Sequence, residues 1–205
     1  MPILKREPDA FPEDIFDLSP AQMPWQVAYV RSRQEKHLAR HLHDSVPYYL
    51  PQWEQVRSRS GRRFSSWLPL FSGYFFFRGA ADERRIAIRS NVVVHLLDIP
   101  DQERLHEELS QLYRLQQEGG VLEPWAELAA GDEVVVRSGP FEGYRGVIVK
   151  EKEKTRLIVS IQALRQSVSV ELGRESVRPA VPVGNQHVSA NPRVRREWME
   201  VNRYR

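Results

Sequence analysis

The chain has 205 residues, of which 41% are hydrophobic and 28% are charged, and its formal net charge is +3 at pH 7. No apolar run approaches the roughly 20 residues that a membrane-spanning helix needs, so the composition argues against a membrane protein. The absence of cysteine excludes disulfide bridges and thiolate metal sites. This length suits two small domains, each with a modest core.

Charge is unevenly distributed along the chain. Residues 1–24 carry two bases, five acids and several prolines without sustained periodicity, and are predicted to form a flexible leader. They lack the apolar core of a secretory signal, so we expect a cytoplasmic protein. Eight lysines and arginines lie between residues 31 and 63 against three acids. This excess indicates either a phosphate-facing surface or a solvated helix beside a basic hairpin tip.

Residues 25–118 are predicted to form an α+β sandwich, in which helices cover a sheet. Aromatic and β-branched residues indicate strands, and Leu105, Leu109 and Leu112 form the packing stripe of the last helix. Ser60-Gly61, flanked by arginines, is a hairpin signal. In chain order we expect a strand at 25–30, a helix at 34–45, an edge strand at 46–53, a hairpin at 54–68, a strand at 73–78, a helix at 80–90, a strand at 92–97 and a helix at 101–118.

The second half of the chain is predicted to contain a small barrel. A linker at 119–130 precedes a module at 131–179, and a basic polar tail follows at 180–205. Short β-branched runs at 134–137, 146–150, 157–161 and 167–172, with a last strand near Val177, are typical of an SH3-like barrel.

Two glycine-containing motifs carry the functional inference. PLFSGYFFF at residues 69–77 places an aromatic run around a turn, and GPFEGYRG at residues 139–146 joins two strands through a tight turn. The first resembles the proline-leucine-phenylalanine-proline-glycine-tyrosine segment of NusG-type transcription factors, with Ser72 in place of the second proline. The second resembles the KOW motif, whose turn would here consist of Gly139, Phe141, Gly143, Tyr144 and Gly146.

The order of the two motifs resembles that of a NusG-type elongation factor over about residues 25–179. The resemblance implies an α/β sandwich with a mixed or antiparallel sheet, called the NGN domain, followed by a KOW barrel. It also implies a non-enzymatic, monomeric factor without cofactor or metal, which binds the clamp helices of the largest RNA polymerase subunit and DNA of the transcription bubble. The corresponding polymerase-binding residues are Tyr29, Phe71, Tyr74 and Phe75, and the nucleic-acid-binding residues are Arg31, Arg33, Lys36, Arg40, His43 and Arg89.

The barrel partner stays open. General factors of this family contact Rho or a ribosomal protein through an aromatic residue, but Leu164, followed by Arg165, stands at that position. This difference argues against both partners. Arg62-Arg63 of the hairpin and the short connection from the first helix to Tyr48 resemble a specialised, RfaH-like branch. The β-branched runs favour strands over a helical form of this region. The alternative is a ribosome-associated or RNA-binding KOW protein that does not bind polymerase.

An enzyme is the competing class. His37 and His41 have the helical spacing of metal ligands, but no glutamate completes a zinc-protease motif, and the glycines at 131–146 lack the ending of a phosphate loop. Ordinary surface histidines are the preferred interpretation.

Overall fold

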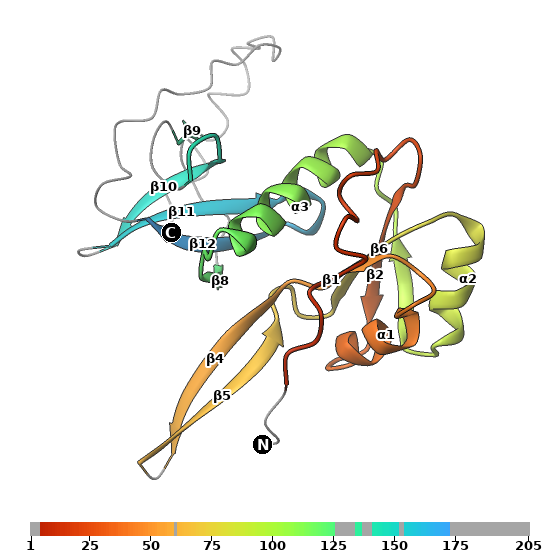
Figure 1. Ribbon diagram of the computed structural model, residues 1–205, viewed down its shortest axis with the longest axis horizontal. Helices are drawn as coiled ribbons and strands as arrows, with labels where there is room; N and C mark the ends of the chain where they lie inside the picture. The colour runs from red at the N-terminus through yellow and green to blue at the C-terminus, as the bar shows by residue number, and fades with distance from the viewer. Residues whose placement is uncertain (1–4, 60, 126–133, 137–140, 152–153, 173–205) are drawn as a thin grey trace, which may run out of the picture.

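The computed structural model describes residues 5–59, 61–125, 134–136, 141–151 and 154–172 (Figure 1). These residues form two five-stranded sheets, a two-stranded hairpin and three α-helices. Every strand pairing is antiparallel, which agrees with the α/β class with antiparallel sheets expected from the sequence. Gly139, the last strand near Val177 and the tail at 180–205 lie outside the described residues.

The first sheet has the strand order β1-β3-β6-β2-β7. Helices cover both of its faces, so its central strands are apolar at nearly every position instead of alternating. Phe75 and Phe77 of β6 pack with α1 and α2, while Phe76 between them faces the opposite layer. The bounds are β1 Ala10–Phe11, β2 Trp25–Val30, β3 Tyr48–Tyr49, β6 Tyr74–Arg78, β7 Val93–Leu97, α1 Glu35–Leu42 and α2 Ala81–Arg89.

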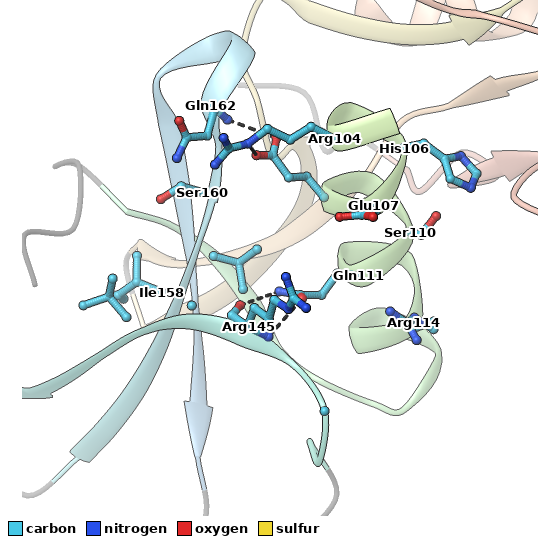
Figure 2. A pocket seen from close by; sticks show the side chains of 15 residues that line it. Arg104, His106, Glu107, Ser110, Gln111, Arg114, Arg145, Ile158, Ser160 and Gln162 are labelled. Atoms are coloured by element: carbon cyan, nitrogen blue, oxygen red, sulfur yellow. Dashed lines mark hydrogen bonds and ion pairs between the residues drawn. The ribbon is translucent and has the colours of Figure 1, made fainter. Parts of the chain in front are cut away.

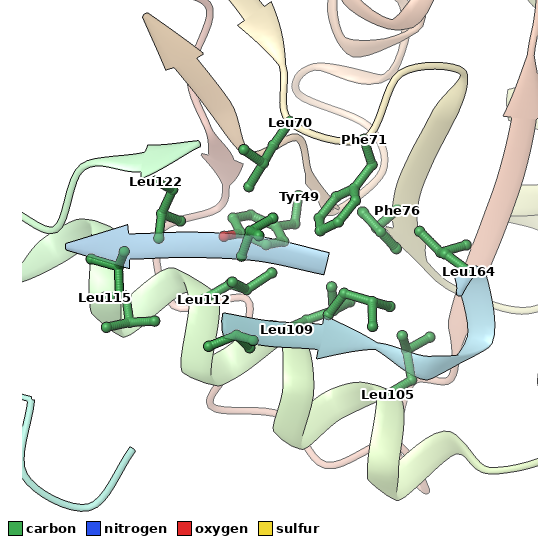
Figure 3. Packing of buried hydrophobic residues seen from close by; sticks show 14 of the residues in the cluster. Tyr49, Leu70, Phe71, Phe76, Leu105, Leu109, Leu112, Leu115, Leu122 and Leu164 are labelled. Atoms are coloured by element: carbon green, nitrogen blue, oxygen red, sulfur yellow. The ribbon is translucent and has the colours of Figure 1, made fainter. Parts of the chain in front are cut away.

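Helix α3, Gln102–Gln117, lies between the two sheets (Figure 1). The side chain of Asp101 caps its start by accepting a hydrogen bond from the Arg104 amide at 3.0 Å, and Gly119, with φ of 81°, follows its end. Leu105, Leu109 and Leu112 are buried, as the predicted stripe requires, and Leu115 extends this stripe. These leucines join one cluster with residues of both sheets (Figure 3).

The second sheet has the order β8-β12-β11-β10-β9. Its strands confirm the β prediction for this region, and Leu122–Trp125, assigned to the linker by the sequence, instead forms its edge strand β8. Whether these strands close as an SH3-like barrel stays a prediction. The bounds are β8 Leu122–Trp125, β9 Val134–Val135, β10 Arg145–Glu151, β11 Lys154–Ile161 and β12 Gln166–Leu172, with the 3-10 helix η1 at Gln162–Leu164.

Strands β4, Gln52–Arg59, and β5, Arg62–Pro69, form a separate two-stranded hairpin that projects from the first sheet (Figure 1). Gly61 has φ of 73° at its turn, as the Ser-Gly signal predicted. The edge strand expected at 46–53 is shorter, because the chain leaves β3 after Tyr49 and enters the hairpin at Gln52.

The prediction of a flexible leader is wrong for residues 5–24, which pack against the first sheet. Strand β1 pairs with β3, and Ile15 is fully buried. The guanidinium of Arg78, also buried, donates five hydrogen bonds of 2.6–2.8 Å to backbone carbonyls of this segment. These bonds satisfy the backbone carbonyls of an irregular segment. The segment can therefore pack against the sheet without the periodic apolar residues of a helix or strand. The four carbonyls belong to Ile15, Leu18, Ser19 and Met23.

Candidate functional site

An exposed group of rings lies on the α3 side of the first sheet. Tyr29 of β2 stands directly opposite Tyr74 of β6 and His95 of β7, so the three side chains share one face. The ring centroid of Tyr29 is 5.5 Å from that of Tyr74 and 5.2 Å from that of His95. Tyr29 keeps 39% of its surface exposed, whereas Val27 on the same face is fully buried. We call Tyr29, Tyr74 and His95 the aromatic patch.

The loop before β6 holds Tyr29 in place. Gly73 has φ of 84°, and a β-carbon at this position would lie 3.1 Å from Cε2 of Tyr29. The buried carboxylate of Glu35 accepts a hydrogen bond from the Gly73 amide at 2.7 Å, and the Gly73 carbonyl accepts one from the Val30 amide at 2.8 Å. Helix α1 and strand β2 therefore fix the turn on which the tyrosine rests.

The four predicted polymerase-binding residues do not form one surface. Tyr29 and Tyr74 lie together, but Phe75 is fully buried on the opposite face with α1 and α2. Phe71 is 2% exposed, and its ring packs edge-on against Phe76 with centroids 5.8 Å apart. Both phenylalanines are core residues: Phe75 faces the layer opposite to that of its strand neighbours Tyr74 and Phe76, and Phe71, in the loop before β6, packs into the cluster that contains Phe76.

The predicted nucleic-acid-binding residues also separate into two groups. Arg31, Arg33 and Arg89 are exposed, and the Arg31 amide bonds the Val92 carbonyl at 2.9 Å, which places the end of β2 beside the loop that contains residues 90–92. A basic edge therefore exists at this end of the first sheet. We call Arg31, Arg33 and Arg89 the basic edge.

The other three basic side chains contact the N-terminal segment. The Lys36 ammonium donates to the Lys5 carbonyl, and burial lowers the pKa of Lys36. Arg40 forms a 3.0 Å ion pair with Glu7, and the His43 ring lies 4.6 Å from that of Phe11. No sequence pattern indicated these contacts, because they depend on the packing of a segment predicted to be flexible.

The predicted KOW turn forms a compact corner. Phe141 and Tyr144 are buried and meet edge-on with ring centroids 6.0 Å apart. Gly143 has φ of 87°, and a β-carbon on Gly146 would lie only 2.3 Å from the Ile158 carbonyl oxygen. Burial, with a smaller contribution from Glu118, raises the pKa of Tyr144. The glycines thus have the roles expected for a tight turn and a close backbone approach.

Leu164, at the position expected to contact the barrel partner, is 7% exposed and belongs to the buried cluster that also contains Phe71 (Figure 3). Arg165 adopts a left-handed conformation with φ of 51° directly after it. In this arrangement, Leu164 therefore contributes to the core between the sheets.

A polar groove of about 610 Å³ lies where α3 meets strands β10 and β11 (Figure 2). The side-chain amide of Gln111 crosses it. This group donates a hydrogen bond to the backbone carbonyl of Arg145 at 2.6 Å and accepts one from the backbone N–H of Arg145 at 3.0 Å. The Glu108 carboxylate accepts a hydrogen bond from the backbone N–H of Gln162 at 3.1 Å, and burial raises the pKa of Glu108. These side chains attach the second sheet to α3. Within the described ranges, no three histidine or acidic side chains gather as a metal site.

Comparisons with known proteins point to transcription. Residues 23–109 match the family model described as transcription termination factor NusG. This match supports a NusG-type transcription factor. The region it covers contains the aromatic patch and the basic edge.

A chain of the MjSpt4:Spt5 complex is 15% identical to this protein and matches it with a TM-score of 0.25. The match covers 77% of this chain and 98% of the other. No curated protein matches the chain. Among the described helices, none is sufficiently long and apolar to cross a membrane.

Sequence reasoning missed three parts of this region: His95, which completes the patch, Glu35, which anchors the Gly73 loop, and Gln111, which joins the sheets. His95 could have been found from a correct register of β2 with β7, because it pairs with Tyr29. Glu35 and Gln111 bond backbone groups distant in sequence and leave no local signal.

Proposed function

We propose that this protein is a transcription elongation factor that binds the clamp helices of the largest RNA polymerase subunit and thereby modulates pausing, termination or antitermination. The match of residues 23–109 to the NusG family supports this proposal. The observation that carries it is the aromatic patch, where the otherwise covered face of the first sheet exposes Tyr29 beside Tyr74 and His95. Tyrosines are suited to such a contact because they bury a large apolar area and keep a polar hydroxyl.

The basic edge supplies a second contact in this proposal. Arg31, Arg33 and Arg89 are exposed at one end of the first sheet and would hold phosphates of the DNA in the transcription bubble. Lys36 and Arg40 contribute less, since the N-terminal segment already contacts both. Residues 25–118 would form the polymerase-binding domain, and residues 131–179 a KOW module for a further partner such as Rho or a ribosomal protein.

The patch can be tested with less change to the core than a phenylalanine variant would cause. Tyr29→Ala combined with Tyr74→Ala truncates one exposed ring and one half-buried ring that packs against the core cluster, whereas Phe71→Ala would open a cavity inside it. The matched control is Ile88→Ala, which truncates an apolar side chain of α2 that is 53% exposed and lies away from the patch. The measurement is binding of each variant to purified core RNA polymerase and to the isolated clamp-helix fragment.

We expect the double tyrosine variant to bind polymerase about 30-fold more weakly, corresponding to a loss of about 2 kcal/mol for a hot-spot pair. The Ile88→Ala variant should bind like the wild type. Unchanged binding of the double variant would refute the patch as the polymerase contact. Recovery of the wild type with ribosomes, and without polymerase, would favour the alternative of a ribosome-associated protein.

A further inference from the structure

The β4–β5 hairpin presents two chemically different faces. Directly opposed residues of an antiparallel pair point to the same side, and so do residues two positions apart along a strand. The pairs Gln55–Ser66 and Arg57–Phe64 therefore share a face, and Arg62 continues it beyond Phe64. We call Gln55, Arg57, Arg62, Phe64 and Ser66 the arginine face.

The opposite face has a different character. It carries Glu54, Val56 and Arg63, and Ser65 donates a hydrogen bond to the Glu54 carboxylate. Nearer the base of the hairpin, the Arg6 guanidinium lies 4.4 Å from the ring centroid of Trp67, so the N-terminal segment contacts this side. The opposite face thus carries the acid Glu54, whereas the arginine face has no acidic residue.

Phe64 is a large aromatic side chain that stays exposed on the arginine face. Its side chain keeps 39% of its surface exposed, next to Arg57 on the paired strand. Arg57 and Arg62 are exposed as well. An aromatic ring between two guanidinium groups combines a surface for base stacking with charges for phosphates, and successive positions on this face are about 7 Å apart.

We infer that the arginine face is a binding site for single-stranded nucleic acid, with Phe64 stacking on a base while Arg57 and Arg62 hold phosphates. The charge of this face complements a polyanion, and its amide and hydroxyl side chains at Gln55 and Ser66 suit a polar ligand. The site is distinct from the basic edge, which lies at the end of β2, and it does not depend on polymerase binding.

The test measures binding of the full chain to labelled oligouridine and oligothymidine of about 20 nucleotides, and to a duplex of the same length, between about 50 and 200 mM salt. The variants are Phe64→Ala and the pair Arg57→Ala with Arg62→Ala. Their matched controls lie on the opposite face of the same hairpin: Val56→Ala for the exposed apolar side chain, and Arg63→Ala for an arginine next to the turn.

We expect Phe64→Ala to weaken single-strand binding by about tenfold, the loss typical of one stacked base. The double arginine variant should reduce the slope of log affinity against log salt by about 1.4, since each single-strand phosphate contact contributes roughly 0.7. Val56→Ala should bind like the wild type, and Arg63→Ala should leave the slope nearly unchanged. Comparing RNA with DNA shows which strand the face prefers.

Three results would overturn the inference: a reduction of the salt slope in Arg63→Ala at least half as large as in the double arginine variant, tighter binding of the duplex than of either single strand, or wild-type binding by Phe64→Ala. The hairpin variants should retain polymerase binding, and the Tyr29→Ala, Tyr74→Ala variant should retain oligonucleotide binding. Failure of this site is therefore distinguishable from failure of the proposed function.

Discussion

Replacing Arg78 with methionine should release the N-terminal segment. All five guanidinium N–H groups donate to carbonyl oxygens of that segment, so methionine leaves four acceptors without a donor. At about 1.5 kcal/mol for each bond to a charged group, the simple sum exceeds 7 kcal/mol. The segment can detach before the whole sum is lost, because detachment returns its carbonyls to water.

The free energy of docking the segment therefore limits the loss. Burial of Ile15 contributes about 2 kcal/mol. The ring of Phe16, which lies 5.4 Å from Trp25 and 4.9 Å from Tyr113, adds about 1 kcal/mol. We expect Arg78→Met to lower the free energy of unfolding by about 3 kcal/mol.

Urea denaturation measures this loss, and hydrogen exchange locates it. The amides of Ile15, Asp17, Gln22 and Met23 donate backbone hydrogen bonds within the segment and should lose their protection. Arg78→Lys keeps the charge but not the planar fork, so its loss should be intermediate. A change below about 0.5 kcal/mol in Arg78→Met, with segment amides still protected, would refute the reasoning.

Three further predictions concern the packing around the site. Gly73→Ala should lower stability by about 1–2 kcal/mol more than Gly61→Ala in urea denaturation, because both glycines have positive φ but only Gly73 meets the ring of Tyr29; equal losses would contradict this contact. His106 accepts a hydrogen bond from the Trp25 indole at 3.2 Å, and burial, with the nearby positive charge of Arg78, lowers its pKa, whereas Glu103 and Glu107 raise it less. The unfolded chain then binds a proton at higher pH than the folded chain, so this histidine lowers the stability of the fold as pH falls below about 6.5. His106→Gln should therefore reduce the difference in unfolding free energy between about pH 7.5 and 5.5. An unchanged difference in the variant would argue against this role of His106. Gln111→Ala should lower stability by about 1–2 kcal/mol and deprotect the Arg145 amide in hydrogen exchange, since it removes both bonds across the groove; unchanged protection would show that the second sheet does not need this side chain.

The helices and most strands of the first sheet could be predicted because their signals are local. Leu105, Leu109 and Leu112 recur at helical spacing, and Asp101 caps the helix they belong to. The packing of residues 5–24 could not be predicted, because Arg78 recognises carbonyl groups, which every residue has. Backbone recognition of this kind leaves no trace in composition or periodicity.

The candidate site was predictable only in part for a related reason. The aromatic run around Gly73 marked the correct loop, but which rings are exposed depends on the layers that cover each face. Phe75 is covered by α1 and α2 on one face of the sheet. On the other face, Tyr29 remains exposed although Val27, two residues earlier on the same strand, is buried. Register and layer order decide these outcomes, and a single strand's sequence specifies neither.

Helix α3 packs against both sheets, and this packing limits which aromatic side chains a partner can contact. Phe71 and Leu164 are buried in the same cluster, which also holds residues of α3 and of the second sheet. Exposing both side chains would cost about 3–6 kcal/mol, at about 1.5–3 kcal/mol for each buried side chain. A partner that contacts Tyr29 and Tyr74 does not incur this cost, because Tyr29 is already exposed. A contact that needs Phe71 must instead recover the cost from its own interface. Weakening the second sheet's attachment to α3 should therefore strengthen a contact through Phe71 and leave one through Tyr29 unchanged.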